Sequence, residues 1–233
     1  MERKKYVVIM AAGSGTRMGA QVPKQFLELG GKAVLQRAIE VFQRACEGIS
    51  VITVLPKEHM NYWRDYCLSR NFTCPQVLVA GGITRFHSVR NALAKVPEGA
   101  LVAVHDGVRP LVTEELVRKL FETAEREPAV VPVIPCVDTM KVLESKDGVL
   151  KAIPGAKADR SVLYGAQTPQ VFHSEVVKGA YMMAYDTAFT DDASVVEKYG
   201  KDICYVEGER FNIKITTADD PVLAKAIMSM MED

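Results

Sequence analysis

A short glycine-rich segment near the amino terminus carries residue types that bind phosphate. The apolar run Tyr6–Met10 leads directly into Ala-Ala-Gly-Ser-Gly-Thr-Arg-Met-Gly at residues 11–19, and Pro23-Lys24 follows. Glycine and alanine let the backbone approach a ligand closely, so its amide groups can donate to an anion. Arg17 and Lys24 add two positive charges. The segment therefore predicts a site for a triphosphate, although a plain strand-to-helix turn with two solvated cations is an equal alternative from these residues alone.

Two common nucleotide motifs do not fit this segment. A dinucleotide fingerprint needs G-x-G-x-x-G, but Met18 stands at the third glycine position, and the next apolar run ends in Pro56-Lys57 instead of an acidic residue. A P-loop needs Gly-Lys followed by Ser or Thr, whereas Gly19 is followed by Ala-Gln. A nicotinamide-dependent oxidoreductase is therefore disfavoured, and a P-loop NTPase is excluded.

The composition is that of a globular protein whose balanced charges produce no strong long-range electrostatic field. The 233 residues include 29 Lys and Arg and 29 Asp and Glu, and 48% are hydrophobic. Balanced charge argues against disorder and against non-specific nucleic-acid or membrane-surface partners. The longest apolar stretch, Ala129–Val137, contains two prolines and is too short to span a membrane. Five cysteines without a C-x-x-C pair suggest reduced thiols, and we expect a cytoplasmic protein.

Short apolar runs alternate with amphipathic stretches, which predicts an α/β fold with a Rossmann-like, mostly parallel twisted sheet flanked by helices. We expect central strands at Tyr6–Met10, Ser50–Leu55, Gln76–Val79, Leu101–His105 and Val130–Ile134. We expect helices around residues 35–42, 59–68 and 89–93, after Thr113, and from Asp219 or Asp220 to the carboxyl terminus, where the last helix closes the domain.

One segment breaks this alternation. Residues 139–154 read as two strands joined at Asp147-Gly148, a favoured tight turn. An isolated two-stranded ribbon is marginally stable, so we expect this protruding β-hairpin arm to pack on a second copy in a homodimer. The sequence thus predicts one domain over residues 1–233, with a dimerisation arm at about 139–160.

Six further motifs follow the glycine loop. They are Gly81-Gly82 through Ser88-Val89, Val104–Pro110, Asp138–Lys141, Gln167–Gln170, Thr190–Ser194 and Asn212–Thr216. Together with Ala-Ala-Gly-x-Gly-x-Arg-Met and Pro-Lys-Gln, their order and spacing resemble the sugar-phosphate nucleotidyltransferases. Within that group the chain resembles the 2-C-methyl-D-erythritol 4-phosphate cytidylyltransferases of the non-mevalonate isoprenoid pathway, over most of its length. The resemblance implies transfer of a cytidylyl group from CTP to methylerythritol phosphate, with release of pyrophosphate.

The resemblance also implies the site residues. Those that would hold the nucleotide are Ala11, Ala12, Gly13, Ser14, Gly15, Gly82 and Ser88. Arg17 and Lys24 would stabilise the transition state. Those that would contact methylerythritol phosphate are Asp106, Arg109, Thr139, Arg160, Thr168, Thr190 and Lys214, of which Arg160 and Lys214 would position its phosphate. Arg160 would serve the site of the neighbouring subunit from beside the arm.

The chemistry is consistent with these residues. A phosphate monoester has a second pKa near ~6 and is mostly deprotonated at neutral pH, so the attack needs no general base. The four histidines and the serines indeed form no nucleophile-base pattern. Asp106 follows an apolar strand and is expected to face the glycine loop, where one carboxylate with phosphate oxygens suits Mg²⁺. Lys214 is expected on a strand, pointing away from Ile213 and Ile215. His105 is expected to be structural.

Two alternatives stay open. A ribitol-5-phosphate cytidylyltransferase would share the chemistry with a different acceptor, and a catalytically inactive nucleotide-binding protein would share the fold. The chain also departs from common forms of the family motifs, because Gly107-Val108 stands where Ala-Ala is frequent and Ile83 where an acidic residue can occur. Neither position supplies a catalytic side chain, but Ile83 lies where the cytosine would be contacted.

Overall fold

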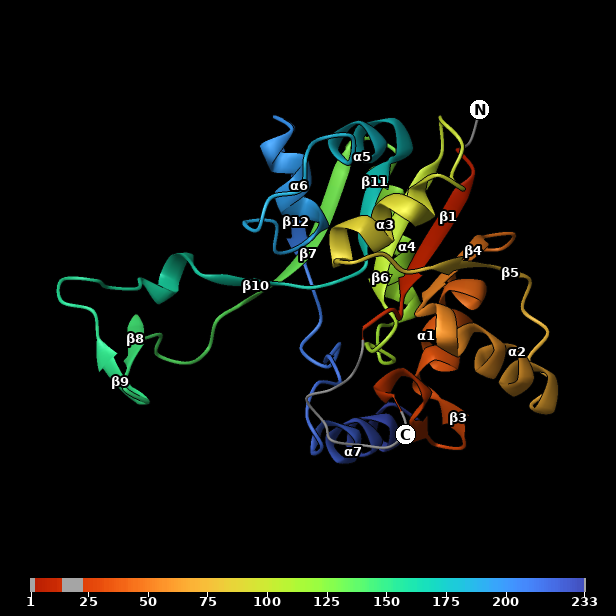
Figure 1. Cartoon of the computed structure of the whole chain (residues 1–233), viewed down its shortest axis with the longest axis horizontal. Helices are drawn as coiled ribbons and strands as arrows, with labels where there is room; N and C mark the ends of the chain where they lie inside the picture. The colour runs from red at the N-terminus through yellow and green to blue at the C-terminus, as the bar shows by residue number, and fades with distance from the viewer. Residues whose placement is uncertain (1–2, 14–22, 233) are drawn as a thin grey trace.

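A twisted, mostly parallel sheet forms the centre of the molecule (Figure 1). The structure is a computed structural model and describes residues 3–13 and 23–232. Within them, the main sheet has the order β10-β7-β11-β6-β1-β4-β5, and β12 pairs with β7. These strands are β1 (Lys5–Met10), β4 (Ser50–Leu55), β5 (Gln76–Ala80), β6 (Leu101–Asp106), β7 (Ala129–Pro135), β10 (Tyr164–Ala166), β11 (Gln170–His173) and β12 (Cys204–Glu207).

The strand register places the motif-bearing ends together. Strand β1 pairs in parallel with β4 and with β6, so that Met10 lies opposite both Val54 and Asp106. Strand β11 runs antiparallel between β6 and β7. All five predicted runs are in the sheet, which confirms the predicted fold class. The expectation that all five are central is wrong for β5, which lies at the sheet edge and is only partly buried.

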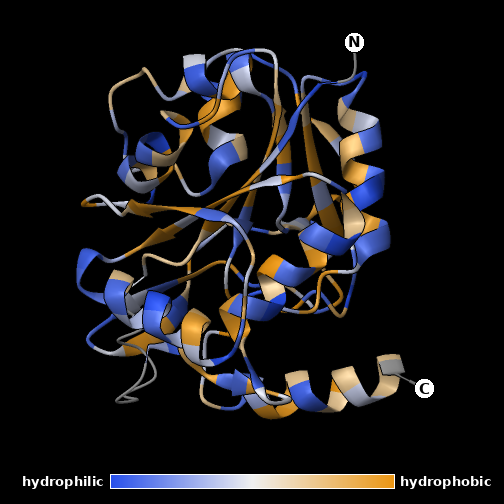
Figure 2. Cartoon of the chain, turned by 90° about the vertical axis from the view of Figure 1, so that its right-hand side faces the viewer, coloured by the Kyte–Doolittle hydropathy of each residue, from blue (hydrophilic) through white to orange (hydrophobic). Residues whose placement is uncertain are grey.

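The two faces of the sheet are covered by two groups of helices. Alternating residues of β1 face opposite sides, so Val7 and Ile9 belong to one apolar cluster and Val8 and Met10 to the other. Helices α1 (Val34–Ala45), α2 (Met60–Ser69) and α4 (Glu114–Ala124) supply the first cluster. Helices α3 (Arg85–Leu93), α5 (Ser174–Ala180) and α6 (Asp192–Lys198) supply the second. Figure 2 shows the resulting concentration of hydrophobic residues in the strands.

The segment before the last helix differs from the prediction. Residues 212–216 do not form a strand; their backbone runs beside the turn after β6, where the Ile215 amide donates to the Val108 carbonyl at 2.9 Å. The predicted alternation of side chains still holds, because Ile213 and Ile215 pack in one small cluster while Lys214 lines a pocket.

The last helix, α7 (Asp220–Glu232), begins where the sequence predicts it. Ala224 and Ile227 are buried in the same small cluster, beside Leu29 of the short β2–β3 hairpin (Glu28–Leu29 and Lys32–Ala33). Three other apolar residues of this helix, Val222, Leu223 and Met230, are exposed. The helix therefore packs on the domain through a narrow apolar stripe that includes Ala224 and Ile227, while much of its apolar surface stays exposed.

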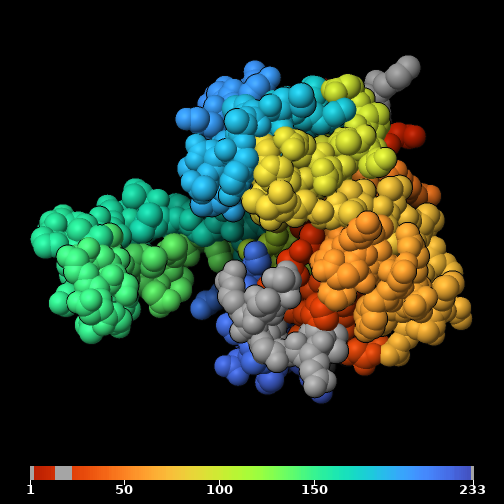
Figure 3. Space-filling view, in the orientation of Figure 1, coloured from red at the N-terminus to blue at the C-terminus, as the bar shows by residue number. Residues whose placement is uncertain are grey.

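The predicted arm is present. Strands β8 (Leu143–Lys146) and β9 (Val149–Ala152) form a separate two-stranded sheet, and Asp147 and Gly148 both have the positive φ that a tight hairpin turn requires. The arm leaves the body after β7, returns to it at β10, and projects from one side (Figures 1 and 3). Its hairpin is almost fully exposed.

Across residues 3–13 and 23–232, no helix has the length and apolar character of a membrane span.

Candidate active site

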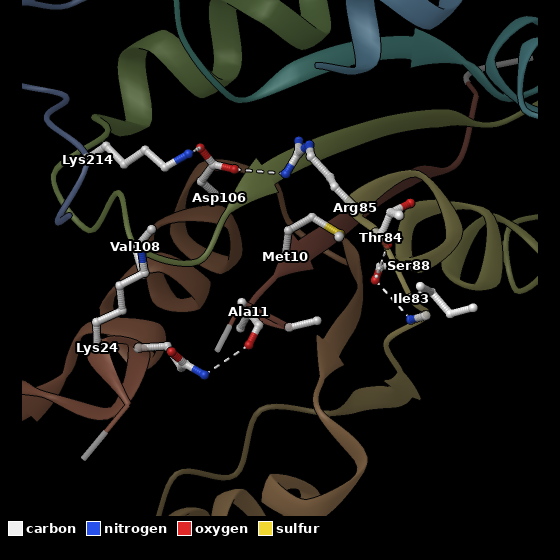
Figure 4. Close-up of a pocket in the computed structure, with 14 residues that line it drawn as sticks. Met10, Ala11, Lys24, Ile83, Thr84, Arg85, Ser88, Asp106, Val108 and Lys214 are labelled. Carbon is white, nitrogen blue, oxygen red and sulfur yellow. Dashed lines mark hydrogen bonds and ion pairs between the residues drawn. The ribbon is translucent and has the colours of Figure 1, made fainter. Parts of the chain in front are cut away.

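A pocket of about 500 Å³ opens at the carboxyl ends of β1 and β6 (Figure 4). This is where parallel sheets place their ligands, because strand ends and helix starts meet there. The pocket is lined by Met10, Ala11, Ala12, Gly13, Lys24, Gln25, Gly82, Ile83, Thr84, Arg85, Ser88, Asp106, Val108 and Lys214. Five of the residues predicted to hold the nucleotide therefore lie around one cavity: Ala11, Ala12, Gly13, Gly82 and Ser88.

The Asp106 carboxylate is the centre of charge in this pocket. Its Oδ1 accepts from Arg85 Nη1 at 3.0 Å, and its Oδ2 lies 3.0 Å from Lys214 Nζ and 3.4 Å from Arg109 Nε. Burial by itself would raise the pKa of Asp106, but the charges of Arg85, Lys214 and Arg109 outweigh it and hold this pKa well below its usual range. Asp106 is therefore ionised at neutral pH.

A buried network behind Asp106 fixes its backbone. The Asp106 amide donates to Thr168 Oγ1 at 3.0 Å, and Thr168 Oγ1 lies 3.2 Å from His105 Nδ1. His105 Nε2 lies 3.0 Å from the Arg109 carbonyl oxygen. Burial lowers the pKa of His105 to about 4, so the ring is neutral and its Nε2 proton is donated to that carbonyl. These contacts give His105 the predicted structural role.

The side of the pocket formed by Gly82 and Ser88 depends on close backbone packing. The Gly82 amide donates to Ser88 Oγ at 2.9 Å, and Ser88 Oγ donates to the Thr84 carbonyl at 2.9 Å. A Cβ added at Gly81 would lie 2.7 Å from Ala12 Cβ, and one added at Gly82 would lie 2.5 Å from His87 Cβ. Two consecutive glycines are therefore required for this loop to reach the end of β1.

The structure brings only part of the predicted set to this pocket. Residues that line it are Ala11, Ala12, Gly13, Lys24, Gly82, Ser88, Asp106 and Lys214. Arg109 and Thr168 lie behind it through their contacts with Asp106. Ser14, Gly15 and Arg17 lie outside the described residues.

Three further predicted residues lie away from this pocket. Thr190 is exposed just before α6, where its amide donates to Ser194 Oγ at 3.1 Å. Arg160 is exposed beside the arm, where its Nη1 donates to the Val137 carbonyl at 2.8 Å, and Thr139 is exposed in the same part of the chain. In one copy of the chain, the arm residues therefore do not reach the Asp106 pocket.

Sequence reasoning missed Arg85. This side chain lines the pocket and pairs with Asp106, and it also pairs with Asp192 at the start of α6. Its place three residues before Ser88, inside a recognised motif, could have indicated that Arg85 lies at the site. The sequence could not indicate its partners, because Asp106 and Asp192 lie 21 and 107 residues further along the chain.

The pocket offers a magnesium ion one carboxylate, that of Asp106, so the remaining ligands would have to come from substrate and water. Asp106 is the one carboxylate in the lining of the pocket, and in the described part of the chain no three His, Cys, Asp or Glu side chains come together as a metal cluster. Mg²⁺ commonly takes one or two carboxylates and completes its shell with phosphate oxygens and water. Asp106 could serve such an ion together with a nucleotide if Lys214 or Arg109 released Oδ2.

Comparison with known proteins gives the family. The model described as IspD, 2-C-methyl-D-erythritol 4-phosphate cytidylyltransferase, matches residues 6–230. The chain belongs to this family. It is 44% identical over 225 residues to the enzyme of that name from Phocaeicola vulgatus, covering 96% of this chain and 99% of the relative. It is 43% identical to that of Bacteroides thetaiotaomicron, covering 97% of this chain and 100% of the relative.

Solved structures agree with this family in fold. The crystal structure of the cytidylyltransferase from Thermus thermophilus superposes with a TM-score of 0.72 at 29% identity, covering 97% of this chain and 99% of that one. That of 4-diphosphocytidyl-2C-methyl-D-erythritol synthase from Anaerococcus prevotii gives a TM-score of 0.79 at 28% identity, covering 98% and 100%. The family predicted from the motifs is thus confirmed: the protein is a cytidylyltransferase of the non-mevalonate isoprenoid pathway.

The packing of Gly82 gives a first prediction. In Gly82→Ala the new Cβ would overlap His87, so the loop must shift and lose the bond between the Gly82 amide and Ser88. We expect the free energy of unfolding to fall by about 1–3 kcal/mol and CTP to bind more weakly. Urea unfolding and calorimetry would measure both. Ile83→Ala is the stability control, since Ile83 is 95% exposed; unchanged stability and CTP affinity in Gly82→Ala would contradict the close-packing argument.

Proposed function

We propose that the pocket around Asp106 is where this cytidylyltransferase joins CTP to 2-C-methyl-D-erythritol 4-phosphate. The observation that carries the proposal concerns Asp106, which pairs with Lys214 and Arg109. Asp106 and Lys214 line one pocket with residues of the Gly82–Ser88 segment at the carboxyl end of β1. The nucleotide would lie against residues 11–15, Gly82 and Ser88. The acceptor phosphate would lie toward Lys214.

In the proposed reaction, an oxygen of the acceptor phosphate attacks the α-phosphorus of CTP. A new phosphorus–oxygen bond forms, the bond from the α-phosphorus to the bridging oxygen breaks, and pyrophosphate leaves. The attacking oxygen is already deprotonated at neutral pH, so no proton has to be removed. The residues therefore act by position and charge. Lys24 and Arg17 would stabilise the α-phosphate in the transition state, and Lys214 would orient the acceptor phosphate, with Arg109, Thr168 and Thr190 supporting that side.

We also propose Mg²⁺ as the cofactor. The ionised Asp106 carboxylate would hold the ion, which would supply neutralisation of the triphosphate charge. The chain itself supplies the walls of the pocket and the cations on both sides of the proposed magnesium position.

We further propose that residues 1–233 form a single nucleotidyltransferase domain, with the dimerisation arm at about 139–160. We also propose that the protein acts in the cytoplasm, because its five unpaired thiols are compatible with a reducing compartment.

The substrate assignment gives a direct test. With CTP and Mg²⁺, we expect pyrophosphate release when methylerythritol phosphate is supplied, and little when ribitol 5-phosphate replaces it. Chelation of Mg²⁺ should abolish turnover. A coupled assay for pyrophosphate measures all three reactions. Turnover with ribitol 5-phosphate alone would overturn the acceptor, and turnover that persists in excess chelator would overturn the cofactor.

Lys214 tests the acceptor side. Lys214→Ala should reduce kcat/KM for methylerythritol phosphate by about 10²-fold, because a positioned cation is lost next to developing charge. The fold should persist, since Asp106 keeps Arg85 and Arg109. Lys225→Ala, which changes an exposed lysine of α7, is the matched control. Steady-state kinetics and thermal melting of both variants decide the matter, and a loss of only a few-fold in Lys214→Ala would remove this residue from the site.

The proposed homodimer rests on apolar surface that one copy leaves uncovered. Val149 and Leu150 of the arm hairpin are 56% and 69% exposed. At the base of the arm, a groove of about 770 Å³ runs over the β10 and β12 side of the sheet and includes Tyr164 and Tyr205, both more than half exposed. Such surfaces on a two-stranded arm are characteristic of subunit contacts. Arg160 and Thr139 would then reach the pocket of the partner subunit.

Mixed dimers test this arrangement. Arg160→Ala and Lys214→Ala should each be nearly inactive alone. When the two are mixed and allowed to exchange subunits, each hybrid dimer has one site with both residues intact if Arg160 acts across the interface. Activity should then recover to roughly a quarter of the wild-type value for random pairing. No recovery despite confirmed exchange, or a fully active monomer in sedimentation, would contradict the shared site.

A further inference from the structure

Arg85 joins two carboxylates that belong to different parts of the fold. It is the first residue of α3, and its Nη1 donates to Asp106 Oδ1 at 3.0 Å while its Nη2 donates to Asp192 Oδ2 at 2.5 Å. Asp106 ends β6 and Asp192 begins α6. One planar guanidinium at the start of α3 therefore links the carboxyl end of β6 to the start of α6, the helix that follows Thr190. Figure 4 shows it directed at Asp106 across the pocket.

The Asp192 end of this ion pair is fully buried. The Asp192 side chain has no exposed surface, and its Oδ1 accepts from the Tyr181 hydroxyl at 2.5 Å. Burial and the nearby Asp192 charge raise the pKa of Tyr181 well above its usual value, so that hydroxyl keeps its proton. A fully buried carboxylate needs a cation, and Arg85 supplies it. Asp192 thus holds Arg85 in one place, which a solvated ion pair would not do.

The link to Asp106 decides where that carboxylate points. Arg85 takes Oδ1, which leaves Oδ2 for Lys214 and Arg109 on the other side. Without Arg85, nothing among these contacts would stop both oxygens from turning toward Lys214 and Arg109. The loop that carries Gly82 would also lose its tie to β6, because Arg85 directly follows the Thr84 cap of α3.

We propose that Arg85 is a positioning residue of the cytidylyl transfer, which bridges Asp106 and Asp192 so that the Asp106 carboxylate is held in a fixed orientation against the nucleotide pocket. Asp192 belongs to the same device, as the anchor that fixes Arg85. Neither residue has to touch a substrate. This proposal rests on the proposed function of the Asp106 pocket.

A double-mutant cycle tests the bridge. Lysine at position 85 keeps the charge but cannot form the two-pronged contact, and asparagine at position 192 keeps the shape but loses the anchoring charge. We expect Arg85→Lys and Asp192→Asn each to lower kcat by at least about tenfold, with KM for both substrates within about threefold of wild type. The combined variant should lose little more than either alone, because the two residues act as one unit.

Two matched variants separate positioning from stability. Tyr181→Phe removes the other hydrogen bond to Asp192 but leaves Arg85 in place, so its melting temperature should fall while kcat stays within about threefold. Arg90→Lys makes the same exchange elsewhere on α3, where the guanidinium lies over the Phe86 ring at 5.8 Å, and should leave kcat unchanged.

The possible outcomes are distinct. Additive losses in the cycle, an unchanged kcat in Arg85→Lys, or an equal loss of kcat in Tyr181→Phe would each overturn the role of Arg85. A rise in KM together with a loss of stability, without a separate effect on kcat, would also overturn it by showing a purely structural residue. If the wild-type enzyme itself gave no pyrophosphate with CTP and methylerythritol phosphate, the proposed function would fail instead.

Discussion

The buried negative charge of Asp106 is the constraint on which the rest of the site depends. A carboxylate at the end of a completely buried strand is unstable unless cations surround it. Arg85, Arg109 and Lys214 meet this need, and they come from three separate segments: the start of α3, the turn after β6 and the stretch before α7. Three cations from distant parts of the chain therefore meet at one carboxylate, which lines the pocket that we propose as the active site.

The central sheet brings the pocket-lining segments close to Asp106. Because β1 and β6 are parallel and in register, Met10 and Asp106 end side by side, and the chain that leaves β1 at Ala11 lines the same pocket as the carboxylate. The loop after β5 can reach the same place only because Gly81 and Gly82 carry no Cβ to collide with Ala12 and His87. Apolar strands therefore set the position of the site, and glycines set how closely its walls approach.

Much of the fold could be predicted from local sequence, and the failures have physical reasons. The apolar strands, the Asp147-Gly148 turn and the Thr113 cap of α4 are local patterns, and each is present. The stretch around Lys214 shows the limit: its alternation correctly predicts which way the side chains face, but a strand also needs a paired neighbour, and that depends on tertiary contacts. Arg85 was missed for the same reason, because Asp192 lies 107 residues away and no spacing rule connects them.

The chain has no net charge, yet both of its proposed substrates are highly anionic. The contacts around Asp106 explain how these facts are compatible. Lys214 is 43% exposed and pairs with Asp106 Oδ2, whereas Arg85 is held from its far side by the fully buried Asp192. In the proposed site, a substrate phosphate would compete with Asp106 for Lys214 without disturbing Arg85. Because the positive charge of Lys214 would stay paired with a carboxylate until substrate binds, such a site would need no strong electrostatic field across the whole molecule.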